Sequence, residues 1–152
     1  MPQIPDRLHI DKEDRKLYDE LDKENMLKFK DKGGRRTRKE QFFFAMVIGF
    51  KNKIKMSLET KEGFFNTRDM RIDDEALIDA IAINDNNSVD VLANREEVFQ
   101  IAEEYAHAGI KLLHNKINST QLGSFDKQFE KEILDIYKDL DLGENGETNT
   151  LS

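Results

Sequence analysis

The segment FFFAMVIGF, residues 42–50, constrains the fold most, because it is apolar on every side in a chain that is otherwise rich in charge. An element without a polar face has to be enclosed by other elements. Thr37 and Glu40, just before it, have the spacing of a capping box, which marks the start of a helix. We therefore predict a buried helix, with Gly49 near its C-terminal end.

Further helices are expected on both sides of this segment. One begins after Asp11 and reaches about residue 25, with Leu17, Tyr18 and Leu21 on its apolar face, and another covers residues 75–83. Asn94 and Glu97 have a weaker form of the capping-box spacing, so a longer helix is predicted from about residue 95 to 118, and a last one begins after Ser124. The long helix contains Gly109, which is unfavourable inside a helix by about 1 kcal/mol relative to Ala. Close packing against another element would explain why a glycine is tolerated there.

A short β element is expected after the buried helix. Ile54, Met56 and Leu58 alternate with polar residues, which is typical of a half-buried strand. Phe64 and Phe65 are expected to start a short partner strand. We thus predict a predominantly α-helical α+β fold, with about five helices and a small β-hairpin between the second and third. The single domain is expected to cover residues 1–142, and residues 143–152 are expected to form a disordered acidic tail.

Charge is divided unevenly along the chain. Residues 1–71 carry a net charge of +5 and residues 72–152 a net charge of −12, for a total of −7. The absence of cysteine excludes disulfides and Cys-ligated metals. The longest apolar run is far shorter than the roughly 20 residues of a membrane span, and the N-terminus has no apolar signal region. We expect a cytoplasmic protein with no membrane contact and no cofactor.

The basic charge is densest in residues 28–71, which hold thirteen Lys and Arg against five acidic residues. A Gly-Gly loop, a helix start and a basic strand face together favour contact with a phosphate backbone. The expected phosphate contacts are Arg35, Arg36, Arg38, Lys39, Lys53 and Lys55. Such contacts give affinity without reading base sequence. A solvated charged face and docking onto an acidic protein are the alternatives.

Two weaker patterns bear on catalysis and metal binding. Glu59 and Lys61 form the E-x-K end of a nuclease pattern in which an acid holds a divalent metal and the lysine steadies the attacking water. The other acid of that pattern and its further strands are missing. Glu103, Glu104 and His107 form half of a carboxylate di-iron motif, without the required second half. We therefore expect no catalytic residue and no metal ligand, and we expect the clustered phenylalanines to pack in the core.

Three segments resemble a small protein family encoded with bacterial DNA phosphorothioation (dnd) systems. They are FFFAMVIGFKNK, DDEALIDAIAI and FQIAEEYAHAGIKLL, which together cover roughly residues 15–115. The most specific pieces are Phe44-Ala45 with Gly49-Phe50, and Glu104-Tyr105-Ala106 with Gly109. The chain departs from the family pattern at His107, where the family has Asn, and in its additional C-terminal helix. The resemblance implies a role beside sulphur modification of DNA or the restriction that depends on it, and it implies no catalytic residue.

Three functional hypotheses follow. The first is a non-enzymatic accessory protein of such a system, which contacts the DNA backbone through the basic segment and partner proteins of the same system through the acidic helical half. The second is a metal-dependent nuclease that uses Glu59 and Lys61. The third is a pure protein-interaction module, in which oppositely charged halves promote binding to partners or head-to-tail homo-oligomers.

Overall fold

The computed structural model describes residues 4–23, 38–119, 135, 136 and 138. The elements in chain order are β1 (Arg7–Asp11), the 3-10 turn η1 (Lys12–Asp14), α1 (Arg15–Lys23), α2 (Arg38–Lys51), β2 (Lys61–Asn66), η2 (Thr67–Asp69), α3 (Ile72–Asn86), η3 (Val89–Ala93) and α4 (Arg95–Ser119). In these residues no helix combines the length and the apolar character needed to cross a membrane.

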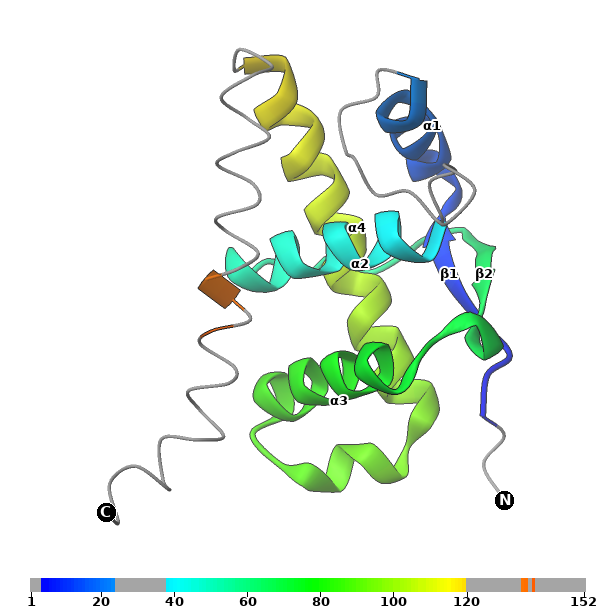
Figure 1. Cartoon of the computed structure of the whole chain (residues 1–152), viewed down its shortest axis with the longest axis vertical. Coiled ribbons are helices and arrows are strands. Elements are labelled where there is room, and N and C mark those ends of the chain that lie inside the picture. The colour runs from blue at the N-terminus through cyan, green and yellow to red at the C-terminus, as the bar shows by residue number, and fades with distance from the viewer. Residues whose placement is uncertain (1–3, 24–37, 120–134, 137, 139–152) are drawn as a thin grey trace.

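Helix α2 is the centre of the core. Every residue from Gln41 to Gly49 is buried, which confirms the prediction made from the apolar run. The long helix α4 crosses α2, while α3 and the small sheet flank the crossing (Figure 1). Because its partners cover α2 on all sides, a helix without a polar face is stable in this charge-rich chain.

The two central helices cross at their glycines. A Cβ atom on Gly49 would overlap the Tyr105 carbonyl, and a Cβ atom on Gly109 would overlap the Ala45 carbonyl. The close packing expected at Gly109 is therefore confirmed. The glycines let the two backbones approach each other more closely than any side chain would allow.

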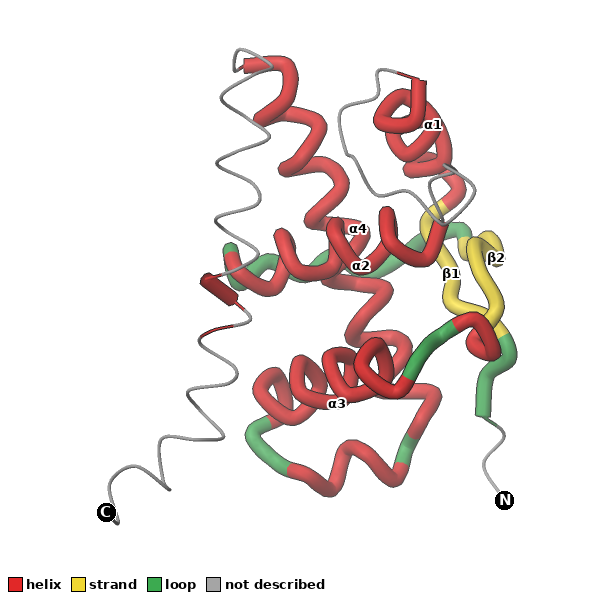
Figure 2. The backbone as a smooth tube through the Cα atoms, viewed as in Figure 1, coloured by secondary structure: helices red, strands yellow, loops and turns green. Residues whose placement is uncertain are grey.

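The sheet differs from the predicted hairpin between the second and third helices. Strand β1 pairs antiparallel with β2, so the partner of the Phe64-Phe65 strand comes from the N-terminus and precedes α1. Residues 52–60 form an irregular connection from the end of α2 back to the sheet (Figure 2). Ile54 and Met56 stay partly exposed in it, with relative exposures of 41% and 39%.

The connection is held by backbone contacts to other elements instead of a strand partner. The Ile54 N–H donates to the Gly49 carbonyl, and the Met56 N–H donates to the Glu104 carbonyl of α4. This segment therefore makes backbone hydrogen bonds to α2 and α4, and it does not form the hydrogen-bond ladder of a paired strand. The predominantly helical α+β class is confirmed, whereas the predicted hairpin was wrong.

The described residues contain four α-helices, and most of the expected helix after Ser124 lies outside them. The expected tail at residues 143–152 also lies outside the described part of the chain. The start of α4 agrees with the sequence pattern, because the Asn94 side chain accepts a hydrogen bond from the Glu97 N–H. Tyr18 and Leu21 of α1 are buried, as its amphipathic spacing predicts.

Candidate functional site

The expected phosphate contacts do not form one surface. Arg38 lies at the start of α2, whereas Lys53 and Lys55 follow its end (Figure 1). A helix of 14 residues separates its ends by about 20 Å. Lys53 and Lys55 do not lie on a strand, since both belong to the irregular connection. Arg35 and Arg36 lie outside the described residues.

Two of the expected contacts are engaged in ion pairs with acidic residues of the second half of the chain. The Lys39 ammonium lies 2.8 Å from an Asp74 carboxylate oxygen, and its side chain is only 15% exposed. The Lys55 ammonium lies 2.9 Å from Asp85. The fold therefore neutralises part of the charge asymmetry that is so marked along the sequence. These lysines have less charge available for an external phosphate than Arg38 has.

Lys53 is exposed and adopts a left-handed backbone conformation, with φ of 56°. This conformation follows directly from the turn that ends α2, where the Lys53 N–H donates to the Phe50 carbonyl. The side chain is therefore displayed at the far end of α2 from Arg38.

Three arginines instead surround strand β2, and we call Arg7, Arg15 and Arg38 the arginine cluster. The guanidinium carbons of Arg15 and Arg38 lie 5.6 and 5.4 Å from the centre of the Phe64 ring. Arg15 also bonds the Glu62 carboxylate at 2.9 Å. The Arg7 side chain lies against Gly63, where a Cβ atom would be 3.3 Å from its terminal nitrogen.

Sequence reasoning found Arg38 but missed Arg7 and Arg15. Arg7 reaches the cluster because β1 pairs with β2, and Arg15 does so because η1 turns α1 toward β2. Neither residue stands in the basic segment. The signal available was the apolar alternation of Leu8 and Ile10, which marks a short strand at the N-terminus.

The clustered phenylalanines belong to the core, as expected. Phe42, Phe43, Phe64 and Phe65 are all at most 9% exposed. The rings of Phe42 and Phe65 meet edge to face at 5.3 Å. They are not available to stack on nucleic-acid bases, so the cluster offers guanidinium groups and not aromatic faces.

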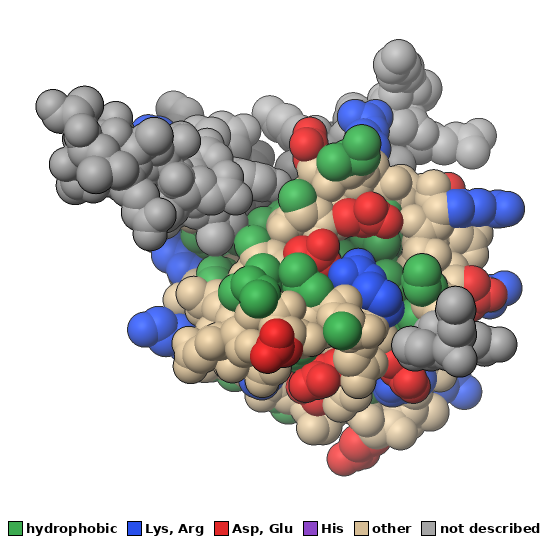
Figure 3. Space-filling model, turned by 90° about the horizontal axis from the view of Figure 1, so that it is seen from below, with side chains coloured by type: hydrophobic (Ala, Val, Ile, Leu, Met, Phe, Trp, Pro, Cys, Tyr) green, Lys and Arg blue, Asp and Glu red, His purple; other side chains and the backbone are tan. Residues whose placement is uncertain are grey.

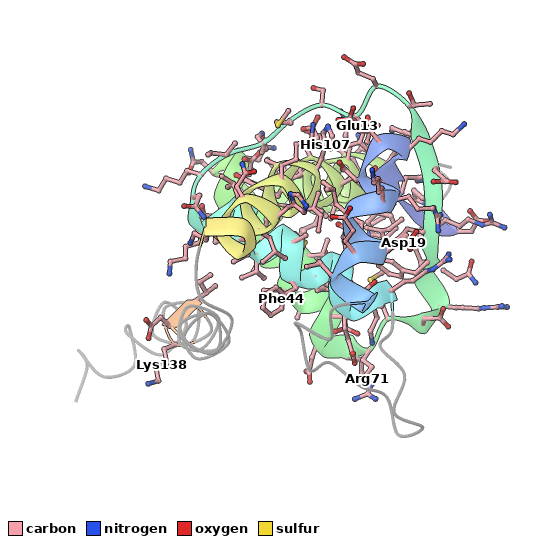
Figure 4. The ribbon with its side chains drawn as sticks, turned by 90° about the horizontal axis from the view of Figure 1, so that it is seen from above. Glu13, Asp19, Phe44, Arg71, His107 and Lys138 are labelled. Carbon is pink, nitrogen blue, oxygen red and sulfur yellow. The ribbon has the colours of Figure 1, made fainter. Side chains whose placement is uncertain are left out.

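An acid–histidine cluster lies where β1 and η1 pack on α4, and it comprises the buried Asp11, Asp14 and His107 with the exposed Glu13 and the partly exposed Lys111. The His107 ring contacts Asp14 through Nδ1 at 2.5 Å, and Lys111 contacts Glu13 at 2.5 Å. Glu13 and His107 lie next to each other (Figure 4). Burial raises the pKa of Asp14 to about 6, against the opposing effect of His107.

Asp11 in this cluster differs from Asp14. Burial alone would raise its pKa, but hydrogen bonds from the backbone N–H groups of Glu13, Glu59 and Thr60 more than offset burial. The pKa of Asp11 therefore lies below its ordinary value, and this carboxylate is ionised at neutral pH.

Glu103, four residues from His107, faces a different partner. Its carboxylate accepts a hydrogen bond from the His9 backbone N–H at 2.6 Å and lies 3.0 Å from the His9 ring. Burial is the largest effect on Glu103 and raises the pKa of its carboxyl group. Glu103 and His107, one helical turn apart on α4, thus make two separate contacts, with β1 and with η1.

The E-x-K pattern does not assemble with other acids in the way its nuclease interpretation needs. Glu59 is exposed, and the Lys61 ammonium lies 4.0 Å from Glu103. Within the described residues, the group of side chains close enough to share a metal ion is Asp11, Glu13 and His107, without Glu59.

The fold and these surfaces define a small, mostly helical protein with an arginine cluster and no assembled set of residues for nuclease catalysis among the described residues. Comparison with protein families matches residues 7–139 to DNA sulphur modification system-associated protein 4. The chain therefore belongs to this family, and it is a protein associated with a dnd DNA sulphur modification system. Comparisons with curated proteins and with solved structures gave no match.

Proposed function

We propose that this protein is a non-catalytic accessory protein that contacts the DNA backbone through the arginine cluster. The observation that carries the proposal is the convergence of three guanidinium groups on residues 62–64, with Glu62 as the carboxylate paired to one of them. We also include Arg35 and Arg36, which precede α2 in the sequence, among the proposed phosphate contacts. Membership of a DNA sulphur modification family supports DNA as the source of phosphate.

The chemistry of arginine fits this role. Its planar guanidinium binds phosphate oxygens in a bidentate manner, and the aromatic contact holds Arg38 in place before DNA arrives. Binding of this kind depends on counterion release and is the same for all sequences. Lys39 and Lys55 pair with acidic residues of the same chain, so we do not include them in the proposed DNA contact. Lys53 is not included either, because it lies at the far end of α2 from Arg38.

The test is fluorescence anisotropy with a short duplex, plain and phosphorothioated, at about 50 and 200 mM salt. We expect the double variant Arg7→Ala/Arg38→Ala to bind at least about tenfold more weakly, with a salt slope reduced by roughly two. Lys39→Ala/Lys55→Ala is the matched control, because it removes the same charge and should keep most of the affinity. Equal losses in both variants, or no binding of the native protein at the lower salt, would contradict the proposal.

The phosphorothioated duplex distinguishes backbone contact from recognition of sulphur. Equal affinity for both duplexes supports simple backbone contact, as the exposed guanidinium groups suggest. The nuclease alternative predicts metal-dependent cleavage of the duplex that is lost in Glu59→Gln, and it is scored in the same samples by gel electrophoresis.

For partner proteins of the same system, we propose the groove between the end of α3 and the start of α4. It has a volume of about 550 Å³, and its lining includes Asp85, Glu96, Glu97 and Glu104 against the single basic residue Lys55. Acidic and basic side chains are interspersed on the face of the molecule seen in Figure 3, so this face as a whole does not carry one sign of charge.

A basic segment of a partner is the chemistry that fits this groove. We expect Glu96→Lys/Glu97→Lys to abolish co-purification with the other proteins of the system when they are co-expressed. Asp73→Lys/Glu75→Lys, at the start of α3, makes the same charge change outside the groove and should not. Salt-dependent self-association without DNA binding would instead favour the interaction-module hypothesis.

A further inference from the structure

The His107 ring is held in an orientation typical of a metal ligand. Its Nδ1 contacts the buried Asp14 carboxylate at 2.5 Å, which fixes the ring and directs Nε2 the other way. The side chains of His107 and Asp14 are 4% and 1% exposed. A carboxylate behind a histidine is the common second layer of protein metal sites, where it sets the tautomer and raises the basicity of the other nitrogen.

The opposite nitrogen faces two carboxylates across a gap. His107 Nε2 lies 3.9 Å from Asp11 Oδ2 and 3.8 Å from Glu13 Oε1, too far for hydrogen bonds. Among the residues that the structure describes, these two carboxylates are the acidic groups within 4 Å of Nε2. Two ligands that are each about 2.1 Å from one ion lie at most about 4.2 Å apart, so both separations are within the limit for a shared cation.

The third separation is adjustable. The three ligand atoms of Asp11, Glu13 and His107 lie within 4.8 Å of one another. Glu13 is 58% exposed, so rotation of its side chain can close the remaining distance and also opens a route from solvent. Asp11 is fixed, because its Oδ2 accepts hydrogen bonds from the backbone N–H groups of Glu59 and Thr60.

The charges in this cluster also favour the binding of a cation. The Asp11 and Asp14 carboxylates are buried in this cluster, and the ammonium group of Lys111 contacts the exposed Glu13 instead of either of them. One Asp14 oxygen is buried without a hydrogen-bond partner in the described structure. Buried negative charge that exceeds its positive partners is unfavourable, and a divalent ion would balance it.

From this geometry we infer that Asp11, Glu13 and His107 form a binding site for a divalent first-row transition-metal ion. One imidazole nitrogen and two carboxylate oxygens suit Zn²⁺ or Mn²⁺, with Asp14 orienting His107 from behind. Lys111 competes for Glu13 Oε1, which it contacts at 2.5 Å, and releases this oxygen when the ion binds. The site differs from the expectation of no metal ligand, because two of its ligands are more than 90 positions from His107 in the chain.

The test is isothermal titration of the untagged, metal-free full chain with ZnCl2, and separately with MnCl2. We expect one ion per chain and at least about tenfold weaker binding in Glu13→Gln and in Asp14→Asn. Glu20→Gln is the matched control, because Glu20 is also a partly exposed carboxylate that contacts a histidine, His114 at 2.8 Å. The control should bind as tightly as the native chain. Circular dichroism checks that each variant is folded.

Glu13 keeps the inference testable, since its exposed side chain can be changed without disturbing the core. A rise in Tm with added metal that is reduced in Glu13→Gln but kept in Glu20→Gln would support the site independently. A Kd above about 1 mM for both ions would overturn the proposed site. An equal loss of affinity in Glu20→Gln and Glu13→Gln would also overturn the site, because the ion would then bind at the surface histidine.

Discussion

Gly49 of α2 and Gly109 of α4 face each other where the two central helices cross, and a Cβ atom on Gly109 would lie 2.8 Å from the Gly49 backbone nitrogen. Both glycines belong to the motifs by which the chain resembles its family. Their role is to let two helix backbones touch, and they fix the position of α4 relative to the buried α2. Because α4 carries His107 and Lys111, this contact also positions the acid–histidine cluster.

We expect Gly109→Ala to destabilise the protein despite the better helix propensity of alanine. Alanine gains about 1 kcal/mol in an exposed helix, but here its methyl group overlaps the rigid Ala45 carbonyl. Overpacking costs about 1–3 kcal/mol, and overlap with rigid backbone puts this site at about 3 kcal/mol, so the net loss after the propensity gain should be about 2 kcal/mol. Urea unfolding measures it. Gly63→Ala is the control, because its Cβ would meet the flexible Arg7 side chain at 3.1 Å and should change stability much less.

Tyr105→Phe should destabilise the fold by about 1 kcal/mol, the usual net contribution of one hydrogen bond. The Tyr105 hydroxyl donates to Asp85 at 2.6 Å, and Asp85 also pairs with Lys55. Burial, followed by the Asp85 contact, raises the pKa of Tyr105, so the hydroxyl remains a donor at neutral pH. A double-mutant cycle with Lys55→Ala measures the coupling, and strict additivity of the two changes would contradict a shared network.

Glu103 should make stability depend on pH. Burial holds the pKa of its carboxyl above the ordinary value of 4.5, so the folded state binds this proton more tightly than the unfolded state does. The resulting stabilisation is fully present below pH 4.5 and is lost as pH rises through the folded pKa. The free energy of unfolding of the native chain, relative to Glu103→Gln, should therefore fall as pH rises from about 4.5 toward 7.

Urea unfolding of both proteins across that range checks this expectation. Glutamine keeps an oxygen that can accept the His9 backbone N–H, so the variant isolates the charge. Glu104→Gln removes a negative charge from the next position of α4 and controls for net charge. A difference between native and Glu103→Gln chains that is constant with pH would show that burial does not perturb this carboxyl group.

Asn94→Ala should cost about 1 kcal/mol by removing the cap of α4. The Asn94 side-chain oxygen accepts the Glu97 N–H at 3.2 Å, and alanine leaves this donor to water. Thermal unfolding followed by circular dichroism is sufficient to measure the change. Gln100→Ala, on an exposed position of the same helix, should have a smaller effect, and an equal effect would argue against capping.

Local patterns predicted the helices well. The capping spacing at Asn94, the amphipathic face of α1 and the all-apolar run in α2 each depend on residues within one or two turns. Such signals act before any tertiary contact forms, so the sequence carries them directly. The strand predicted at Ile54 and Met56 shows the limit of this reasoning, because alternation without a strand partner does not form a ladder.

The sequence by itself determined that α2 had to be buried, approximately which segments form helices, and which family the chain resembles. Only the tertiary structure decided that β1 pairs with β2, that Lys39 and Lys55 are neutralised by acids of the other half, and that Asp14 meets His107 across 93 positions. Helix formation follows a local period, whereas these contacts depend on how the packed helices bring distant segments together. Charge along a chain therefore does not predict charge on its surface.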